Sequence, residues 1–310
     1  MTQTAVSVGP ARRAGRTAGD RRRSGPGGWM VLPALLFFVV FAIVPLIVAL
    51  SLSFTQWDAI SDPVWVGFAN WTSVLADPVT INALVLTLKV IAISWIVQTP
   101  ISLLLGTWTA GRQRSRAVLG AIFFLPLILS SAAVAIAFKA ILDPNFGLSA
   151  SLGIPFLKQD WLGNQQLILY VVIFIIAWQF VPFHTLLYQG GVRQIPASLY
   201  EAAEIDGAGR VKQFFNITLP QLRYTIVTSS TLMIVGSLTY FDVIFVLTGG
   251  VPSSGIRILP ILMYVTGFSA SQFGQASVMA MILVIIGLAI ALLLTKLSGF
   301  TRMTSQQEGL

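Results

Sequence analysis

The chain has 310 residues, of which 55% are hydrophobic and only 10% are charged, and its formal net charge is +8. Soluble domains carry about 25% charged residues, so this composition excludes an ordinary water-soluble fold and indicates an integral membrane protein. Cysteine is absent and histidine occurs once, as His184, which excludes disulfide frameworks, thiolate chemistry and a multi-histidine metal site built from this sequence.

Six stretches are long and apolar enough to cross a bilayer core about 30 Å thick, which needs about 20 helical residues. Each is predicted to be helical, because in hydrocarbon every backbone polar group needs a partner within its own segment. We place the spans at residues 29–53, 81–108, 117–140, 167–190, 222–247 and 275–297. A further apolar patch, residues 258–268, is too short to span and is predicted to be an outer-surface or re-entrant segment.

The basic residues gather on one side of these spans. Fifteen of the nineteen lie in the N-terminal tail, in the loops after the second and fourth spans, and near the C-terminus. Because cytoplasmic loops carry an excess of Lys and Arg, both termini are predicted to be cytoplasmic. The predicted organisation is a disordered basic tail over residues 1–28, an all-α transmembrane domain over 29–300 and a C-terminal tail over 301–310.

The Arg-rich start has two other interpretations. A signal peptide has an apolar core of about 7–15 residues, but the run from Trp29 to Phe54 is longer and no small-residue cleavage site follows it. A basic tail can also bind nucleic acid, but next to a membrane span it is typical of a topology anchor attracted to anionic lipid. Membrane lipid, and no nucleic acid, is therefore the expected partner of the tail.

The chain shows no energy source of its own. It lacks the phosphate-binding pattern G-x-x-x-x-G-K-[ST], and no G-x-G-x-x-G turn follows a strand. The ionisable candidates in the spans are Lys89, Lys139 and Asp242, all toward the outer ends. We therefore expect no enzymatic activity, no cofactor and no metal in this chain, and uphill transport would need free energy from another protein.

The loop over residues 193–220, after the fourth span, is the most informative stretch. Ser198 and Glu201 have the spacing of a capping box, which predicts a short helix over 198–206 with a left-handed cap at Gly207. A second helix is predicted between this cap and Pro220, where the chain turns into the fifth span. Its apolar face would consist of Val211, Phe214, Phe215 and Thr218.

The first of these helices combines small side chains with acidic edges. Small residues let another protein approach the backbone, and the charges of Glu201, Glu204 and Asp206 can set its register. The alternative is an amphipathic helix in the headgroup layer. Three acidic residues beside an anionic surface weigh against lipid and favour a protein partner. A membrane transferase with a metal held by the same three carboxylates is a further alternative.

The sequence of this loop resembles the EAA loop of permease subunits in binding-protein-dependent ABC importers. The family pattern is E-A-A-x-x-D-G-A, then a Phe, then L-P, and the positions in register are Glu201, Ala202, Ala203, Asp206, Gly207, Ala208, Phe214, Leu219 and Pro220. Ile195, Pro196 and Tyr200 also fit the branch that imports carbohydrates, and residues 67–86 and 248–280 resemble the first of the two sugar-permease subunits. Val251 departs from the Gly that is common there.

The resemblance implies a type I ABC importer permease in a bacterial-type plasma membrane. The helix over 198–206 would sit in a cleft of an ATPase subunit, which would bind ATP and magnesium in place of this chain. The implied partners are a second homologous permease, two ATPase subunits, an extracytoplasmic solute-binding protein and a carbohydrate substrate. The alternative is an ion-coupled secondary transporter or a channel, which would act from this chain alone.

The fifth span offers the candidate substrate residues. Sugars are gripped by aromatic faces with a few hydrogen-bonding groups, and this span carries Tyr240, Phe241, Asp242 and Phe245. Asp242 is a functional candidate, or else it pairs with Lys139 or a backbone group near the interface. His184 either donates to a backbone carbonyl or relays protons, and the absence of a nearby carboxylate in the sequence favours the first interpretation.

Overall fold

The computed structural model describes residues 28–111, 120, 122–148, 152–153, 159–250 and 255–297. The chain forms two units, divided between Leu46 and Ile47. Within the described ranges, four helices are long and apolar enough to cross a membrane, or five if a bent pair of helices counts as one span. The predicted C-terminal tail lies outside these ranges, as does the basic tail up to residue 27.

The N-terminal apolar segment is helical over 24 residues, from Trp29 to Leu52, as predicted, and it is long and apolar enough to span a membrane. Neither α1 nor the π-helical turn η2 contains a buried residue. A helix that is apolar on all sides is suited to lipid or to a partner protein. Its successive parts are η1 (Gly28–Val31), α1 (Leu32–Phe38), η2 (Val39–Ile43) and α2 (Val44–Leu52).

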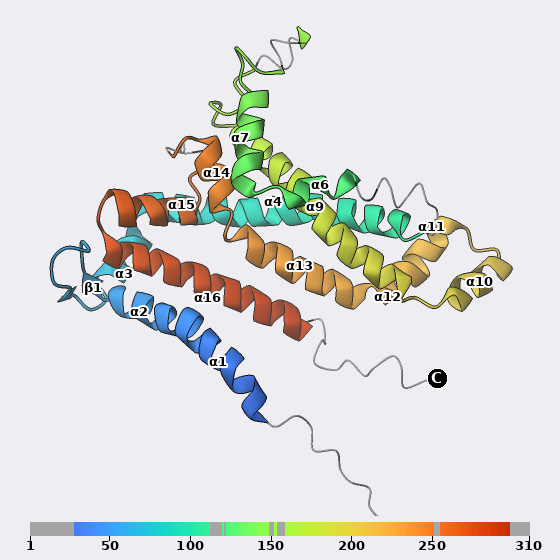
Figure 1. Ribbon diagram of the computed structural model, residues 1–310, viewed down its shortest axis with the longest axis horizontal. Helices are drawn as coiled ribbons and strands as arrows, with labels where there is room; N and C mark the ends of the chain where they lie inside the picture. Colours follow the sequence, from blue (N-terminus) through green and yellow to red (C-terminus); the bar gives the residue numbers. More distant parts are fainter. Residues whose placement is uncertain are drawn as a thin grey trace, which may run out of the picture. The chain divides into compact units, whose positions relative to one another are not determined.

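Three continuous helices of the second unit match three further predicted segments in position and are long and apolar enough to cross a membrane. These are α4 (Pro78–Thr109), α9 (Ile168–Arg193) and α16 (Phe273–Leu297), and they cross the second unit in Figure 1. Asp77 begins α4 by accepting hydrogen bonds from the backbone N–H groups of Val79 and Thr80, at 3.1 and 2.9 Å. Pro100 and Pro182 are accommodated inside α4 and α9.

The third span is not one helix, and the prediction of a continuous helix over 117–140 is wrong. The described part breaks between α6 (Leu125–Ile128) and α7 (Ser131–Ile141), where Leu129 and Ser130 are extended, with ψ of 142° and 147°. The Ser130 hydroxyl accepts a hydrogen bond from the N–H of Ala133 at 3.2 Å and so starts a new helix. Apolarity alone could not reveal this break.

The fifth span is also broken, which corrects the prediction of one helix over 222–247. It consists of α13 (Arg223–Ser237) and α14 (Phe241–Leu247), whose axes differ by 44°. Ser237 and Thr239 donate side-chain hydrogen bonds back to the carbonyls of Met233 and Gly236. Such bonds compete with the helical ladder and bend it.

The apolar patch over 258–268 begins inside the core of the second unit. It forms α15 (Leu259–Tyr264) and the π-helical turn η5 (Val265–Ser269), and Ile258, Leu259 and Ile261 are fully buried. The backbone N–H of Leu259 donates to the hydroxyl of Thr87 on α4 at 2.9 Å. The surface alternative for this patch is therefore wrong for its first turns, and the re-entrant alternative remains.

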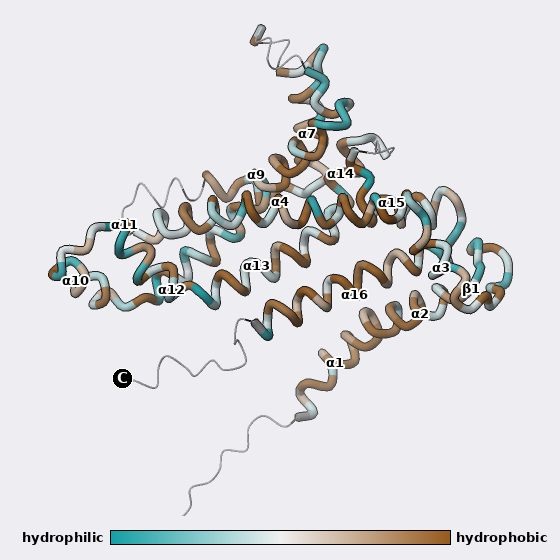
Figure 2. The backbone as a smooth tube through the Cα atoms, turned by 180° about the vertical axis from the view of Figure 1, so that it is seen from behind, coloured by the Kyte–Doolittle hydropathy of each residue, from teal (hydrophilic) through white to brown (hydrophobic). Residues whose placement is uncertain are grey.

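The two ends of the second unit carry its shorter polar elements. One end holds β1 (Thr55–Gln56), which pairs antiparallel with β2 (Val64–Trp65), and α3 (Ala69–Ala76). The other holds α10 (Ala197–Ile205) and the segment that follows it. Figure 2 shows hydrophilic colour gathering around β1 and near α11, while α16 between them is mostly hydrophobic. The apolar middle with polar ends is the pattern expected of a membrane protein.

Candidate functional site

The short helix α10 projects at one end of the second unit (Figure 1). It contains no buried residue, and the side chain of Ile205 is 88% exposed. The helix begins at Ala197 after Pro196, without a side-chain cap, so the predicted capping box of Ser198 and Glu201 is wrong. Pro196 holds an extended backbone directly before the helix, which places Ser198 inside the first turn.

The end of α10 agrees with the prediction for Gly207. Its φ is +73°, in the left-handed region that favours glycine. The N–H of Ala208 donates to the carbonyl of Ala203 at 2.8 Å, and that of Gly207 donates to Glu204 at 3.0 Å. These two bonds form a Schellman cap, which turns the chain sharply away from the helix. Gly207 therefore sets the direction in which α10 is presented.

The segment after Gly207 contains α11 (Arg210–Gln213), the π-helical turn η4 (Phe214–Thr218) and α12 (Leu219–Gln221), which includes Pro220. The predicted single face is wrong, because the π turn changes the helical period. Thr218 is buried and Phe214 is half-buried, whereas Val211 and Phe215 are 72% and 58% exposed. The Tyr200 hydroxyl lies 2.9 Å from that of Thr218, so η4 holds α10 in place.

This end is tightly joined to the long helices. Gly106 on α4 lies against α9, where an added Cβ would be only 2.6 Å from the Cβ of Tyr188. Gly191 near the end of α9 lies against Leu222, where an added Cβ would be 2.7 Å from Cδ2. The Gln189 amide also donates to the carbonyl of Thr109 at 2.9 Å. Because these contacts leave little free space between the helices, a displacement of α10 would be transmitted to α9 and α13.

The exposed face near α10 combines acidic and small residues. Glu201, Glu204 and Asp206 are exposed, and no ion pair or hydrogen bond engages their carboxylates within the part of the chain that the structure describes. Ala202 is exposed between them, and Ala203 and Ala208 are half-buried. No group of three possible ligands comes close enough to hold a metal among the described residues, which removes support from the transferase alternative. The face is available to a partner.

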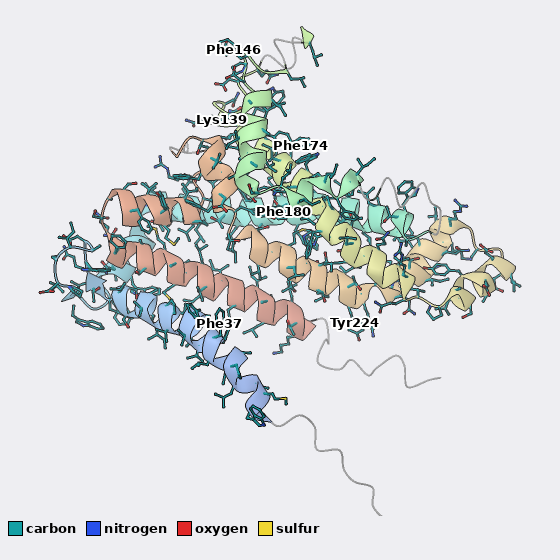
Figure 3. The ribbon with its side chains drawn as sticks, in the orientation of Figure 1. Phe37, Lys139, Phe146, Phe174, Phe180 and Tyr224 are labelled. Carbon is teal, nitrogen blue, oxygen red and sulfur yellow. The ribbon has the colours of Figure 1, made fainter. Side chains whose placement is uncertain are left out.

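A cavity of about 410 Å³, open to the surface of the chain, lies where the two broken spans meet α9. The α6–α7 break contributes Leu127 and Ser131, and the α13–α14 break contributes Gly236 and Thr239. The other lining residues are Phe180, Phe183, Leu232, Tyr240, Asp242 and Val243. Phe180 is labelled beside the crossing of α9 and α4 in Figure 3. The cavity offers aromatic faces with a few polar groups, the usual make-up of a small-molecule site.

The structure separates the four candidate substrate residues into two pairs. Tyr240 and Asp242 line the cavity, and the Tyr240 ring stacks on Phe180 with centroids 5.9 Å apart. Phe241 and Phe245 stack on each other at 4.9 Å and contact Tyr264 instead. Successive side chains of α14 diverge around the helix, so neighbours in sequence do not share one site.

Sequence reasoning missed Gln179 on α9. This side chain is 2% exposed, and its amide donates to the carbonyl of Leu129 at 3.1 Å and lies 3.4 Å from the hydroxyl of Ser131. Gln179 thereby supplies a partner to the backbone that the α6–α7 break frees. A glutamine in an otherwise apolar span is the signal that could have identified it.

The interpretations of two ionisable residues are also corrected. Asp242 and Lys139 line different pockets, and no ion pair joins them among the described residues, so the alternative that pairs Asp242 with Lys139 is wrong. Lys139 lies along α7, apart from Phe180 (Figure 3). His184 lies with its Nδ1 2.9 Å from the hydroxyl of Ser229 on α13, not bonded to a backbone carbonyl.

Comparison with known proteins identifies the family. Residues 98–303 match the family described as "Binding-protein-dependent transport system inner membrane component". The matched region includes both the α10 segment and the cavity. The chain therefore belongs to this family, and it is a multi-pass membrane protein of the permease type.

Its relatives match along nearly their whole length. The chain is 32% identical to the multiple sugar-binding transport system permease protein MsmF of Streptococcus mutans, over 87% of this chain and 94% of that one. It is 29% identical to the arabinooligosaccharides transport system permease protein AraP of Bacillus subtilis, over 86% of each chain. A crystal structure of a bacterial ABC transporter that imports the acidic polysaccharide alginate has the same fold. Its TM-score is 0.77 at 23% identity, covering 89% of this chain and 95% of that one.

Proposed function

We propose that this chain is a transmembrane permease subunit of an ATP-driven ABC importer for a carbohydrate, in a bacterial-type plasma membrane. The exposed helix α10, ended by the left-handed Gly207, carries the proposal, because it is held in place by η4 and presents carboxylates that have no partner within the described chain. The printed names of the relatives MsmF and AraP support a carbohydrate as the cargo.

The proposed membrane arrangement has six spans with both termini in the cytoplasm. Four spans are Trp29–Leu52, α4, α9 and α16, and each broken pair, α6–α7 and α13–α14, makes one more. The concentration of basic residues at the ends predicted to be cytoplasmic supports this orientation. Interrupted backbone is tolerated at membrane depth where it is buried or lines a cavity, and both breaks meet such a cavity.

In the proposed mechanism the energy arrives from outside the chain. ATP and magnesium bind to two partner ATPase subunits, and α10 docks in a cleft of one of them through Glu201 and the alanine face. Closure of the ATPases moves α10, and the close packing at Gly106 and Gly191 transmits that movement to α4, α9 and α13. A second permease completes the pathway, and a solute-binding protein delivers cargo. Asp242 and Ser131 then hydrogen-bond sugar hydroxyls in the cavity, which Tyr240 also lines.

Reconstitution tests this proposal against its alternative. Proteoliposomes that hold the complete complex should accumulate sugar only when ATP is present on the side of the membrane where the ATPase subunits lie. A secondary transporter or channel would move solute from this chain alone, and Asp242 in the cavity would then be the ion-binding candidate. Uphill uptake driven by an ion gradient in the absence of ATPase subunits contradicts the proposal.

A further inference from the structure

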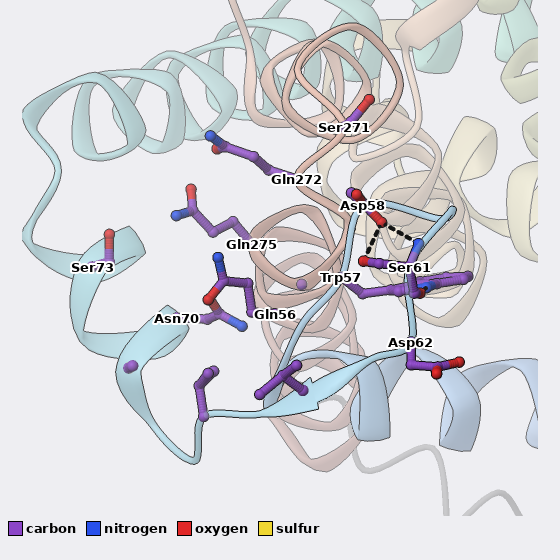
Figure 4. Close-up of a pocket in the computed structure, with 14 residues that line it drawn as sticks. Gln56, Trp57, Asp58, Ser61, Asp62, Asn70, Ser73, Ser271, Gln272 and Gln275 are labelled. Atoms are coloured by element: carbon purple, nitrogen blue, oxygen red, sulfur yellow. Dashed lines mark hydrogen bonds between the residues drawn. The ribbon is translucent and has the colours of Figure 1, made fainter.

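A second, polar pocket of about 580 Å³ opens at the other end of the second unit (Figure 4). Its walls come from the β1–β2 hairpin, α3 and the turn that enters α16, and none of the residues that line the cavity at the broken spans belongs to it. Its polar lining consists of four amides, three hydroxyls and two carboxylates: Gln56, Asn70, Gln272, Gln275, Ser61, Ser73, Ser271, Asp58 and Asp62. We call it the mouth pocket.

The walls of the mouth pocket are fixed to one another. The Asn70 amide nitrogen on α3 donates to the carbonyls of Ser53 and Thr55, at 3.1 and 2.8 Å. The N–H of Phe273 donates to the carbonyl of Trp57 at 3.0 Å. Gly274 lies so close to β1 that an added Cβ would overlap the Thr55 carbonyl oxygen. The pocket is therefore a built feature that exists before any ligand arrives.

Two residues at the rim of the mouth pocket have a strained backbone. The only non-glycine residues with positive φ in the described ranges are Ala59, at 68°, and Ser271, at 55°. Ser271 lines the pocket, and Ala59 follows the lining residue Asp58. Such conformations persist where the surroundings fix them, and they cluster at binding sites. The surroundings therefore fix the backbone at two points of this rim.

The chemistry of the lining selects a class of ligand. Amides and hydroxyls both donate and accept hydrogen bonds, which matches the hydroxyl groups of a sugar. Asn70 is 8% exposed, and its amide oxygen accepts no bond from the described residues. Trp57 adds an apolar surface of the kind that packs on a sugar ring. A volume of this order is typical of a small-molecule site.

Charge excludes anionic ligands from the mouth pocket. No Lys, Arg or His is among its lining residues, whereas Asp58 and Asp62 both are. The side-chain hydroxyl of Ser61, followed by the N–H groups of Ser61 and Ile60, hydrogen-bonds the Asp58 carboxylate and lowers its pKa to about 2. Asp58 thus stays negative at every pH in which cells live, and it repels uronic acids and phosphates.

We propose that the mouth pocket is a second saccharide site, which binds neutral sugar units and rejects anionic ones before cargo reaches the cavity at the broken spans. The inference rests on the proposed function, because only in an importer of the proposed orientation does this pocket face arriving cargo. The side chains of Gln272, Gln275 and Gln56 lie on the side of the pocket that faces Ser73 on α3 (Figure 4). They are the groups that hydrogen-bond the sugar.

The absence of native cysteine permits a site-specific test on the full chain in nanodiscs. The thiol introduced by Ser73→Cys reports on the mouth pocket through its rate of reaction with a maleimide. Maltotriose or cellotriose should slow this reaction, and the anionic trigalacturonate should not. A thiol introduced by Ser198→Cys on α10 should react at the same rate with and without sugar, which controls for indirect effects and for folding.

Variants then assign the protection to named groups. Gln272→Ala with Gln275→Ala should raise the half-protecting maltotriose concentration by about tenfold, the cost of lost hydrogen bonds. The matched change Gln166→Ala, at an exposed glutamine outside the pocket, should leave it unchanged. Asp62→Lys should allow trigalacturonate to protect. The proposal is overturned if neither neutral sugar protects, or if trigalacturonate protects the unmodified pocket equally well.

Two separate measurements distinguish a failure of this inference from a failure of the proposed function. ATP-driven uptake is measured in the complete complex, and protection in the isolated chain. Uptake without protection rejects the mouth site and keeps the importer. Protection without ATP-driven uptake rejects the importer, and with it the gating role proposed for the mouth pocket, although sugar binding there would stand.

Discussion

The docking segment around α10 and the cavity at the two broken spans are built in opposite ways. The segment is one contiguous stretch, residues 195–220, whose exposed groups face outward. The cavity collects side chains from the breaks of two spans and from α9, which are up to about a hundred residues apart in sequence. One site is therefore encoded locally, and the other exists only after the helices have packed.

This difference shows where each site is sensitive to change. The docking segment depends on one backbone conformation and on exposed charge, so substitutions there should affect transport without affecting stability. The cavity depends on packing, so substitutions there should affect affinity or the fold itself. The predictions below test that division, beginning with the largest expected effect.

Gly207→Val should abolish ATP-driven uptake while leaving membrane insertion intact. A β-branched residue cannot adopt a φ of +73° without strain, so the Schellman cap would open and α10 would point elsewhere. Gly209→Val is the matched control, because Gly209 has a φ of −66° and open space around its Cβ position. Equal loss of uptake in both variants would mean that the left-handed turn carries no special role.

Glu201→Lys should lower ATP-driven uptake by about tenfold or more, because it reverses a charge at the proposed ATPase cleft. The melting temperature should not change, since the carboxylate is exposed and has no partner in the described chain. Glu201→Gln, which keeps the size and removes the charge, should give an intermediate rate. If Glu201→Lys instead melted the protein with uptake per folded molecule unchanged, Glu201 would be a structural residue only.

The sequence was sufficient for the local site and insufficient for the assembled one. The position of α10 and its glycine cap followed from residues 198–207, because a Schellman cap is specified by neighbours in sequence. The start of α10 does not follow from the capping-box pattern, because Pro196 determines where the helix begins. The spans matched by α4, α9 and α16 followed from apolar length alone.

The breaks at Ser130 and after Ser237 could not be predicted in the same way. Their freed backbone groups are satisfied partly by residues distant in sequence, such as Gln179, which donates to Leu129 from about fifty residues away. Hydropathy is averaged over a window of residues that includes the break, so the sequence predicts a single helix for each of the two spans. For the same reason Phe180 and Ser131 were absent from the predicted substrate residues, although both line the cavity.

The cavity itself gives a prediction of intermediate size. Asp242→Leu should raise the KM for sugar uptake severalfold to about tenfold, because it removes an exposed hydrogen-bonding group from the lining. Asp242→Asn should retain most of the uptake, since an amide still hydrogen-bonds a hydroxyl. Complete loss of uptake in Asp242→Asn would instead indicate that the negative charge is essential, as in ion-coupled transport.

The smallest effect is expected where the two sites are joined, at the contact of α4 with α9. Gly106→Ala places a methyl group 2.6 Å from Tyr188 Cβ and 3.0 Å from the Thr185 carbonyl oxygen, so it should destabilise the fold by about 1–3 kcal/mol. Gly190→Ala meets nothing within 4 Å and should be neutral or stabilising by about 0.5–1 kcal/mol, because it lowers the entropy of the unfolded chain. Thermal unfolding in detergent measures both. A Gly106→Ala protein as stable as the Gly190→Ala protein would show that α4 and α9 have room to slide, and the close packing proposed to carry motion from α10 would be absent.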